Sequence, residues 1–294
     1  MLIERKNCPI CAANKFKTLY ALPYHDNRIQ QFFKNYYKER INPYLKELEK
    51  YDYAIYECLN CSLIFQKYIP SEKFSKRLYE QIINEEERKI KKEKLSTAGY
   101  FKDFELFKKI IKKENSDISI FEFGSGNGDW AYEAKKLNFS VTVNEYSKNR
   151  IETLEKKGFK ICNNINECKD KFDIIYSDQV FEHIPNPAEV LKLLVTLLKK
   201  NGYIYLKFPS SFMFKNKLKM NYQPKKDCAH PLEHINILNK KVFFHLIEGM
   251  NLEISYYNRH SVFTYKKYLK FLKDFFYFNQ VLIKNKTSLI IDGI

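Results

Sequence analysis

From residue 116 onward, short apolar runs alternate with segments in which apolar residues recur every three or four positions. The runs predict strands, and the three-to-four spacing predicts helices with one buried face. The expected strands are 118–123, 140–146, 160–164, 172–178, 203–209 and 251–258. The helices between them are marked by apolar positions around Trp130, Ile151, Val190 and Val242. Such alternation across 116–260 is typical of a doubly wound α/β domain with a mostly parallel sheet.

The expected ends of two late elements depend on short signals. The helix that begins near Val190 keeps its apolar spacing to Leu198, and Asn201-Gly202 is expected to end it before the strand 203–209. Further on, 271–283 reads FLKDFFYFNQVLI. No run of 18 uncharged apolar residues exists, so we interpret this segment as an amphipathic surface or interface helix rather than a membrane span. It is our candidate contact for a homodimer.

The first 115 residues follow a different pattern, with more polar positions. One or two polar helices are expected over 27–50, with Pro43 as the break, and a charged helical pattern continues from 72 to 115. We therefore divide the chain into four parts. They are a small N-terminal domain (1–71), a helical linker (72–115), the α/β domain (116–260) with a lid at 210–236, and a C-terminal extension (261–294).

Composition adds a formal charge of +16, from 51 basic and 35 acidic residues. Basic surfaces attract polyanions, so a nucleic-acid partner has to be considered. However, 44 of the basic residues are Lys and 7 are Arg, whereas recognition of phosphates and bases favours the Arg fork. An AT-rich genome produces this bias without selection for binding, and an anionic small substrate fits the same charge. We therefore favour a small-molecule substrate over a nucleic acid.

Four of the seven cysteines form two CxxC pairs, "NCPIC" with Cys8 and Cys11, and "ECLNC" with Cys58 and Cys61. Two such pairs supply the four thiolates that a structural zinc ion prefers. Residues 1–15 carry charges and two cysteines where a secretion signal needs apolar residues, so a cytoplasmic location is expected. Because disulfides are rare there, we favour zinc over two disulfides or unrelated reduced pairs.

The stretch FEFGSGNG (121–128) places three glycines at alternate positions between an expected strand and an expected helix. Glycines let a ligand approach the backbone closely, and the following helix start favours an anion. The spacing GxGxG differs from the GxGxxG of dinucleotide-binding folds, and Asp129 would repel a pyrophosphate. Glu122 and Glu145 instead suit a cofactor with an ammonium and a sulfonium group. Glu145, at the end of the second strand, is expected to accept both ribose hydroxyls.

With these motifs, residues 95–260 resemble class I S-adenosylmethionine-dependent methyltransferases. The resemblance rests on FEFGSGNG, on NEYS with Glu145, and on the run from FDIIYSDQVFEH to YIYLKFP. It implies a Rossmann-like seven-stranded sheet and S-adenosylmethionine as cofactor. The cofactor contacts that it implies are Glu122, Gly124, Gly126, Gly128, Glu145, Tyr146, Asn163, Asp178 and Gln179. At Asn163 the chain departs from the family, which often has an acid there for the adenine amine.

The two CxxC pairs also resemble the zinc-binding module fused to certain nucleotide-sugar methyltransferases, although the helical insertion between them departs from that pattern. Family members of the small-molecule type often show "EH" after the fourth strand, here Glu182-His183, and a histidine after the fifth strand, here in HPLEHIN (230–236). A hydroxyl acceptor needs a base near neutral pH, and histidine suits this role. The candidates, in order, are His230, His183 and His234, of which His234 alternatively caps the next helix.

The lid is rich in Phe, Lys and Asn, and specificity is often built in such segments. Its lysines are candidates for holding the phosphates of a nucleotide-activated substrate, or they form a solvated basic loop. They are Lys215, Lys217, Lys219, Lys225 and Lys226. Tyr176 and Tyr222 are equally candidate substrate contacts or packing residues.

Taken together, the favoured function is O-methylation of a sugar or nucleotide-activated small molecule in surface polysaccharide biosynthesis. The alternatives are C- or N-methylation of a nucleotide sugar, and methylation of RNA. SDQVFEH lacks the Asn/Asp-Pro-Pro-aromatic clamp of exocyclic-amine methyltransferases, and the chain has no Pro-Cys pair for cytosine C5 chemistry. A cofactor-binding remnant that serves as an assembly partner is the non-enzymatic alternative.

Overall fold

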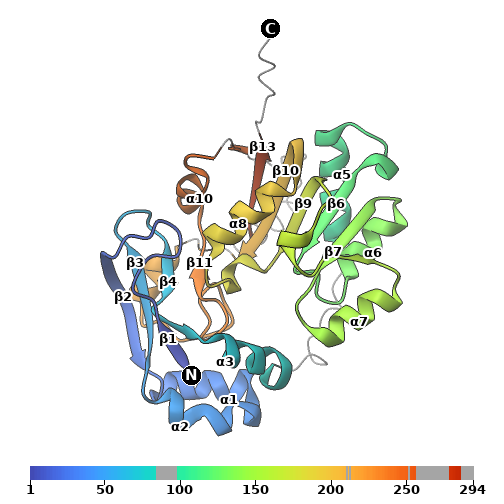
Figure 1. The fold of residues 1–294 in the computed structure, drawn as a ribbon. Helices are drawn as coiled ribbons and strands as arrows, with labels where there is room; N and C mark the ends of the chain where they lie inside the picture. Colours follow the sequence, from blue (N-terminus) through green and yellow to red (C-terminus); the bar gives the residue numbers. More distant parts are fainter. Residues whose placement is uncertain (84–97, 210, 212, 251, 256–277, 286–294) are drawn as a thin grey trace, which may run out of the picture.

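The computed structural model describes residues 1–83, 98–209, 211, 213–250, 252–255 and 278–285 (Figure 1). Its largest sheet has seven strands in the order β12-β13-β10-β9-β6-β7-β8. The five strands from β8 to β10 run parallel, and β13 is antiparallel to both of its neighbours. The strands are β6 (Ser119–Phe123), β7 (Ser140–Asn144), β8 (Lys160–Ile161), β9 (Phe172–Asp178), β10 (Leu198–Pro209), β12 (Leu252–Ser255) and β13 (Phe278–Asn285). The predicted Rossmann-like α/β fold with a seven-stranded sheet is confirmed.

Alternating residues of the central strands face two helical layers. Ile120 on β6 and Ile174 on β9 pack with one layer, whereas the adjacent Phe121 and Ile175 pack with the other. The first layer contains α5 (Ala98–Ile111) and α6 (Asp129–Lys136), and α7 (Lys148–Lys156) packs on β7. The second contains α8 (Pro187–Thr196) and α10 (Lys240–Ile247). Because both faces are covered, β6 and β9 are buried along most of their length.

The N-terminal residues form a separate sheet that recruits a strand from the far end of the chain. Its order is β11-β4-β3-β2, and β11 comes from the predicted lid. A short ladder of β1 and β5 lies beside this sheet (Figure 1). The strands are β1 (Leu2–Glu4), β2 (Phe16–Pro23), β3 (Asp52–Cys58), β4 (Ile64–Gln66), β5 (Tyr68–Pro70) and β11 (Asn236–Ile237). The lid is thus tied to the N-terminal half by main-chain hydrogen bonds.

Short helices complete this half. Between β2 and β3 lie α1 (Asn27–Tyr36), a 3₁₀ helix (Lys38–Tyr44) that contains Pro43, and α2 (Leu45–Leu48). After β5 come α3 (Glu72–Arg77) and a π-helical turn (Leu78–Ile82), and α9 (Phe214–Lys219) lies in the lid. Residues of α1, α9 and the lid share one apolar core with β2 and β3. None of the helices in the described ranges is long and apolar enough to cross a membrane.

The structure corrects three boundary predictions. First, α8 ends at Thr196, and Leu198 already pairs with Phe172 as the first residue of β10. Asn201-Gly202 lies inside β10, where the pairing register shifts, and a Cβ at Gly202 would come within 3.0 Å of the Asp173 carbonyl oxygen. The dipeptide therefore marks a close backbone approach rather than a helix end.

Second, the helix predicted over 271–283 is wrong for its last part, since 278–285 forms β13 between β10 and β12. A short apolar run does not distinguish strand from helix, and here pairing with two strands decides. Residues 271–277 lie outside the described residues, so the dimer contact remains a prediction. The predicted strand 160–164 is shorter than expected, because only Lys160–Ile161 pairs with β7.

Candidate active site and metal centre

The sheet order reverses between β6 and β9, which are adjacent although α6, β7, α7 and β8 lie between them in sequence (Figure 1). Ligands of open α/β sheets bind beyond the carboxyl ends of the strands at such a point. The glycine loop follows β6, Glu145 follows β7, and Gln179 to His183 follow β9. The structure therefore brings the predicted cofactor and acceptor residues to one edge of the sheet.

All three glycines of the loop have positive φ, but the space around them differs. A Cβ on Gly124 would lie 2.5 Å from Val180 Cγ2, and a Cβ on Gly128 would lie 2.5 Å from Leu154 Cδ2. These two positions exclude side chains because of packing inside the protein. A Cβ on Gly126, which has φ +61°, would meet no atom within 4 Å and would face open space. Gly126 is therefore the point at which a ligand can approach the main chain.

Glu145 is held against this loop. Its Oε2 accepts a hydrogen bond from the Gly126 backbone N–H at 2.8 Å and lies 3.5 Å from an Arg150 nitrogen. Its Oε1 accepts from the backbone N–H groups of Tyr146 and Ser147 at 2.8 and 3.0 Å. A carboxylate has about four acceptor positions. The side chain is thus fixed beside Gly126 before any cofactor binds.

The other predicted cofactor residues differ in exposure and in hydrogen bonding. Glu122 is buried at 5% exposure, whereas the Tyr146 side chain is 69% exposed. The Asn163 carbonyl oxygen accepts from Asn144 Nδ2 at 3.2 Å. Asp178 Oδ2 accepts from the Tyr176 hydroxyl at 3.2 Å. Gln179 takes a positive φ of 58°, and its N–H donates to the Lys207 carbonyl at 2.9 Å.

A buried polar network beneath the loop was not predicted. Asp103 of α5 is fully buried and forms an ion pair with Lys207 of β10. Its Oδ2 also accepts from Trp130 Nε1 and the Tyr176 hydroxyl, both at 3.3 Å. The Trp130 and Tyr176 rings stack at 3.9 Å. Tyr176 is therefore a packing residue, and burial raises its pKa well above the usual value.

The three predicted histidines do come together. The His234 ring centroid lies 3.9 Å from that of His230 and 4.8 Å from that of His183. His183 Nδ1 lies 2.9 Å from the Tyr79 hydroxyl and 2.8 Å from the Glu233 carbonyl oxygen. His183 belongs to the 3₁₀ turn Phe181–His183 that follows β9, whereas the other two histidines come from the lid.

These histidines differ in accessibility. The His183 side chain is 20% exposed, whereas His230 is 1% exposed and has its Nε2 3.3 Å from Glu233 Oε1. The alternative capping role of His234 is wrong, because Asn239 caps α10 and His234 Nδ1 lies 2.5 Å from the Asp227 carbonyl oxygen. Burial lowers the pKa of His234 well below the usual value, and the charges of its two histidine neighbours add to this effect.

The acidic residues beside the histidines are also buried. Glu233 is 2% exposed, and its Oε1 accepts from the Tyr37 hydroxyl at 3.0 Å. Glu182 is 1% exposed, and burial raises the pKa of its carboxyl well above the usual value. Each glutamate directly precedes a predicted histidine in the sequence. The motifs EH and HPLEH therefore include both glutamates, but no role was predicted for either.

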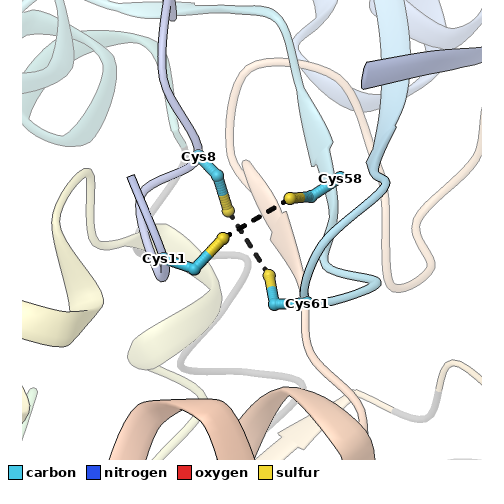
Figure 2. A group of neighbouring side chains, drawn as sticks. All are labelled: Cys8, Cys11, Cys58 and Cys61. Atoms are coloured by element: carbon cyan, nitrogen blue, oxygen red, sulfur yellow. Dashed lines mark hydrogen bonds between the residues drawn. The ribbon is translucent and has the colours of Figure 1, made fainter. Parts of the chain in front are cut away.

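The four cysteines of the CxxC pairs converge on one point (Figure 2). Cys8 Sγ lies 3.5 Å from Cys61 Sγ, and Cys11 Sγ lies 3.5 Å from Cys58 Sγ. A tetrahedral zinc site with Zn–S bonds of about 2.3 Å has sulfurs about 3.8 Å apart. The hydrogen bond from Cys61 lowers the pKa of the Cys8 thiol to about 5. The residues present therefore fit a four-thiolate zinc ion.

The two CxxC turns have the same backbone geometry. The Cys8 N–H donates to the Ala13 carbonyl at 2.8 Å, and the Cys58 N–H donates to the Leu63 carbonyl at 2.8 Å. The residues after the second cysteines, Ala12 and Ser62, take positive φ of 57° and 61°. This repeated turn aims both pairs of sulfurs toward one centre.

Arg5 connects this module to the histidine region and was missed in the sequence. Its Nη1 donates to the Ile235 carbonyl at 3.0 Å and to Asn236 Oδ1 at 2.8 Å. Its Nη2 donates to the Pro185 carbonyl at 3.0 Å. One buried guanidinium thus joins the N-terminal strand region, the lid and the loop before α8. A lone Arg near the N-terminus offers no sequence signal for such a role.

The predicted phosphate-binding lysines lie in three places, and Lys217 and Lys219 are exposed residues of α9. Lys215 forms an ion pair with Glu57 of β3. Lys225 and Lys226 instead line a cavity of about 310 Å³ between α1 and the lid. Lys226 Nζ lies 5.5 Å from the centroid of the Tyr36 ring in the same cavity. Tyr222 is 4% exposed and is a packing residue.

A family model described as a methyltransferase domain matches residues 96–257. The structure of the plantazolicin methyltransferase BpumL in complex with SAH gives a TM-score of 0.49 at 17% identity, over 72% of this chain and 93% of that chain. An S-adenosylmethionine-dependent methyltransferase from Mesorhizobium loti gives 0.45 at 12% identity, over 58% and 93%. No curated protein matches the chain.

The family match covers more than half of the chain, including the glycine loop, Glu145, the turn after β9 and the lid. The sheet order places the glycine loop, Glu145 and the turn after β9 at the point where ligands of open α/β sheets bind. The chain therefore belongs to the methyltransferase-domain family and is an S-adenosylmethionine-dependent methyltransferase.

Proposed function

We propose that this enzyme methylates a hydroxyl of a sugar or another nucleotide-linked small molecule, in surface polysaccharide biosynthesis. The observation that carries the proposal is the cluster of His183, His230 and His234 beside the switch point, next to a cavity with cationic and aromatic walls. Histidines suit removal of a hydroxyl proton near neutral pH.

The cavity supports a nucleotide-linked acceptor. Arg28, Lys225 and Lys226 line it, and these cations suit phosphate groups. Phe32 and Tyr36 supply rings against which a base can stack, and their centroids lie 6.1 and 5.4 Å from that of His230. A nucleotide in this cavity would place its attached sugar toward the histidines.

For the cofactor, we propose that a ribose hydroxyl binds Glu145 at the acceptor position that its three backbone hydrogen bonds leave open, while the amino-acid part passes over Gly126. When bound, S-adenosylmethionine supplies an electrophilic methyl group that an acceptor in line with the sulfur–carbon bond can take. His230 is our first candidate for the proton acceptor, because Glu233 Oε1 lies 3.3 Å from its Nε2 and can orient the ring. Since His230 is 1% exposed, the acceptor reaches it only when the lid residues shift.

We also propose that Cys8, Cys11, Cys58 and Cys61 hold a structural zinc ion. Four thiolates leave no open position for substrate, so this ion stabilises the N-terminal sheet rather than taking part in catalysis.

The deciding experiment is a screen with methyl-labelled S-adenosylmethionine against nucleotide sugars, other nucleotide conjugates and bulk RNA. We expect label in nucleotide sugars, and degradation of the product should place the methyl group on oxygen. A methyl group found on carbon or nitrogen would show that the enzyme is a C- or N-methyltransferase instead. Transfer to RNA alone would refute the small-molecule acceptor.

A further inference from the structure

A second group of potential metal ligands lies at the carboxyl end of β9. Glu182, His183 and His234 each place one ligand atom within 4.8 Å of the other two. Glu182 and His183 belong to the turn after β9, and His234 comes from the lid. The group shares no residue with the four cysteines. It brings one carboxylate and two imidazoles, a ligand set typical of zinc and other divalent transition metals.

Glu182 gives an independent reason to look for a ligand here. Its side chain is 1% exposed, and neither carboxyl oxygen has a hydrogen-bond partner among the described residues. Its Oε1 lies 3.8 Å from His183 Nε2, which is beyond hydrogen-bond distance. Burying a carboxylate without a partner is costly, so it requires either a proton or a cation beside it.

The hydrogen bonds of the two histidines are those of metal ligands. His183 Nδ1 lies 2.8 Å from the Glu233 carbonyl oxygen, and His234 Nδ1 lies 2.5 Å from the Asp227 carbonyl oxygen. A carbonyl oxygen only accepts, so each Nδ1 carries the proton and each Nε2 carries the lone pair in the neutral ring. Ligating histidines typically donate their other ring N–H to a carbonyl or carboxylate in this way.

From these observations we infer that Glu182, His183 and His234 bind one divalent transition-metal ion of the zinc class. Bonds of about 2.1 Å in a tetrahedral site place the ligand atoms about 3.4 Å apart, so the three side chains contract around the ion. Three protein ligands leave a fourth position open. Binding of the ion does not depend on the proposed function, whereas its role does.

In that role the acceptor hydroxyl takes the open position, and the ion lowers the pKa of the hydroxyl. The O–H bond breaks and His230 receives the proton. The oxygen then forms a bond to the methyl carbon as the sulfur–carbon bond breaks, and the electron pair of that bond stays on the sulfur of S-adenosylhomocysteine. No oxidant or reductant is needed.

Metal stoichiometry of the full-length, tag-free protein tests the inference. After equilibrium dialysis against Zn²⁺ and elemental analysis, we expect about two zinc ions per chain in the wild type, with four cysteines on one ion and the new site holding the other. Glu182→Gln keeps the size of the side chain and should bind one. Glu152→Gln, which removes an exposed carboxylate on α7, should still bind two. Equal zinc content in the wild type and Glu182→Gln overturns the inference.

Cobalt substitution tests the wild type without any variant, should Glu182→Gln fail to fold. Cobalt bound to thiolates absorbs strongly through sulfur-to-metal charge transfer, whereas cobalt bound to imidazole and carboxylate does not. We expect two equivalents of Co²⁺ to bind, of which one lacks the charge-transfer band. If all bound cobalt shows thiolate absorption, no second site exists.

These readouts are separate from the acceptor screen. Two metal ions without transfer to any nucleotide sugar or other nucleotide conjugate would retain the metal site and refute the proposed acceptor. Transfer to a nucleotide sugar with one zinc ion per chain would retain the acceptor and refute the metal site.

Discussion

Replacing Gly126 by valine tests whether the open position on the glycine loop receives the cofactor. Gly126 has φ +61° and no neighbouring atom within 4 Å of an added Cβ, so the substitution meets backbone strain but no clash within the protein. Such strain costs about 1–3 kcal/mol. Gly249 offers a matched control, because it has φ +74° and equally open surroundings, and lies between α10 and the edge strand β12, away from β6.

The two variants should therefore lose similar amounts of folding stability but differ in their affinity for S-adenosylhomocysteine. A side chain at 126 points into the space beside Glu145, whose Oε2 is 2.8 Å from the Gly126 nitrogen. Loss of one charged hydrogen bond to ribose costs about 1.5–3 kcal/mol, which corresponds to a factor of about 10 to 100 in Kd. With the added steric overlap, we expect Gly126→Val to weaken S-adenosylhomocysteine binding by at least about 100-fold.

Calorimetry with S-adenosylhomocysteine measures the affinity, and thermal unfolding measures the stability. Gly249→Val should bind S-adenosylhomocysteine as tightly as the wild type does. The melting temperature should fall in both variants, by about 2–4 °C for each kcal/mol of lost stability. Equal affinity in Gly126→Val and Gly249→Val would refute our placement of the cofactor over this loop. Tight binding of NAD by the wild type would refute the choice of cofactor.

Three further predictions concern other parts of the chain. Cys58→Ser should lose the zinc of the four-cysteine site and destabilise the N-terminal sheet, as measured by elemental analysis and thermal unfolding. His230→Ala should lower turnover by about 100-fold or more while leaving the affinity for S-adenosylhomocysteine unchanged. Asp173→Asn should lower the free energy of unfolding by about 1–2 kcal/mol at pH 7, measured by denaturant titration. Burial opposes ionisation of Asp173, but hydrogen bonds from Lys199, Ser119 and Lys113 lower its pKa overall.

The sign of the pH effect follows from that lowered pKa. Asp173 stabilises the fold above its unfolded pKa of about 3.9, and this contribution is lost as pH falls through its lower folded pKa. The difference between wild type and Asp173→Asn should therefore shrink below about pH 4. A difference that grows in acid would contradict the assignment.

An exposed histidine supplies the control for His230→Ala, and the metal content of the wild type is the reference for Cys58→Ser. His25→Ala removes an exposed histidine and should keep wild-type turnover, so a similar loss there would show a general effect. If His230→Ala keeps normal turnover, the proton acceptor is another group. A wild-type protein free of metal would refute the zinc module.

The sequence was informative where the chemistry depends on residues close together in the chain. The loop from Gly124 to Gly128 and the two CxxC turns carry their geometry in a few consecutive residues, so their spacing predicted what the structure shows. Glu145 was predictable because it ends a strand whose neighbour carries the loop. Histidines that follow strands of one parallel sheet were likewise expected at the same edge.

Features that depend on long-range pairing could not be read from the sequence. β13 forms because β10 and β12 both pair with it, and its residues alone fit a helix equally well. Asp103 is 104 positions from Lys207, and Arg5 is more than 200 positions from the lid residues that it contacts. In each case a single polar residue acquires its partner only through the tertiary fold.

The pairing of β11 with β4 determines whether a shortened form of this enzyme can fold. Asn236 and Ile237 closely follow His234 in the chain, and their main-chain partners are Phe65 and Ile64 of the N-terminal half. Deleting the first 83 residues would leave that strand edge and its apolar neighbours uncovered. We therefore expect the N-terminal half to be an integral wall of the proposed acceptor site, and the remainder expressed alone should aggregate rather than form a minimal enzyme.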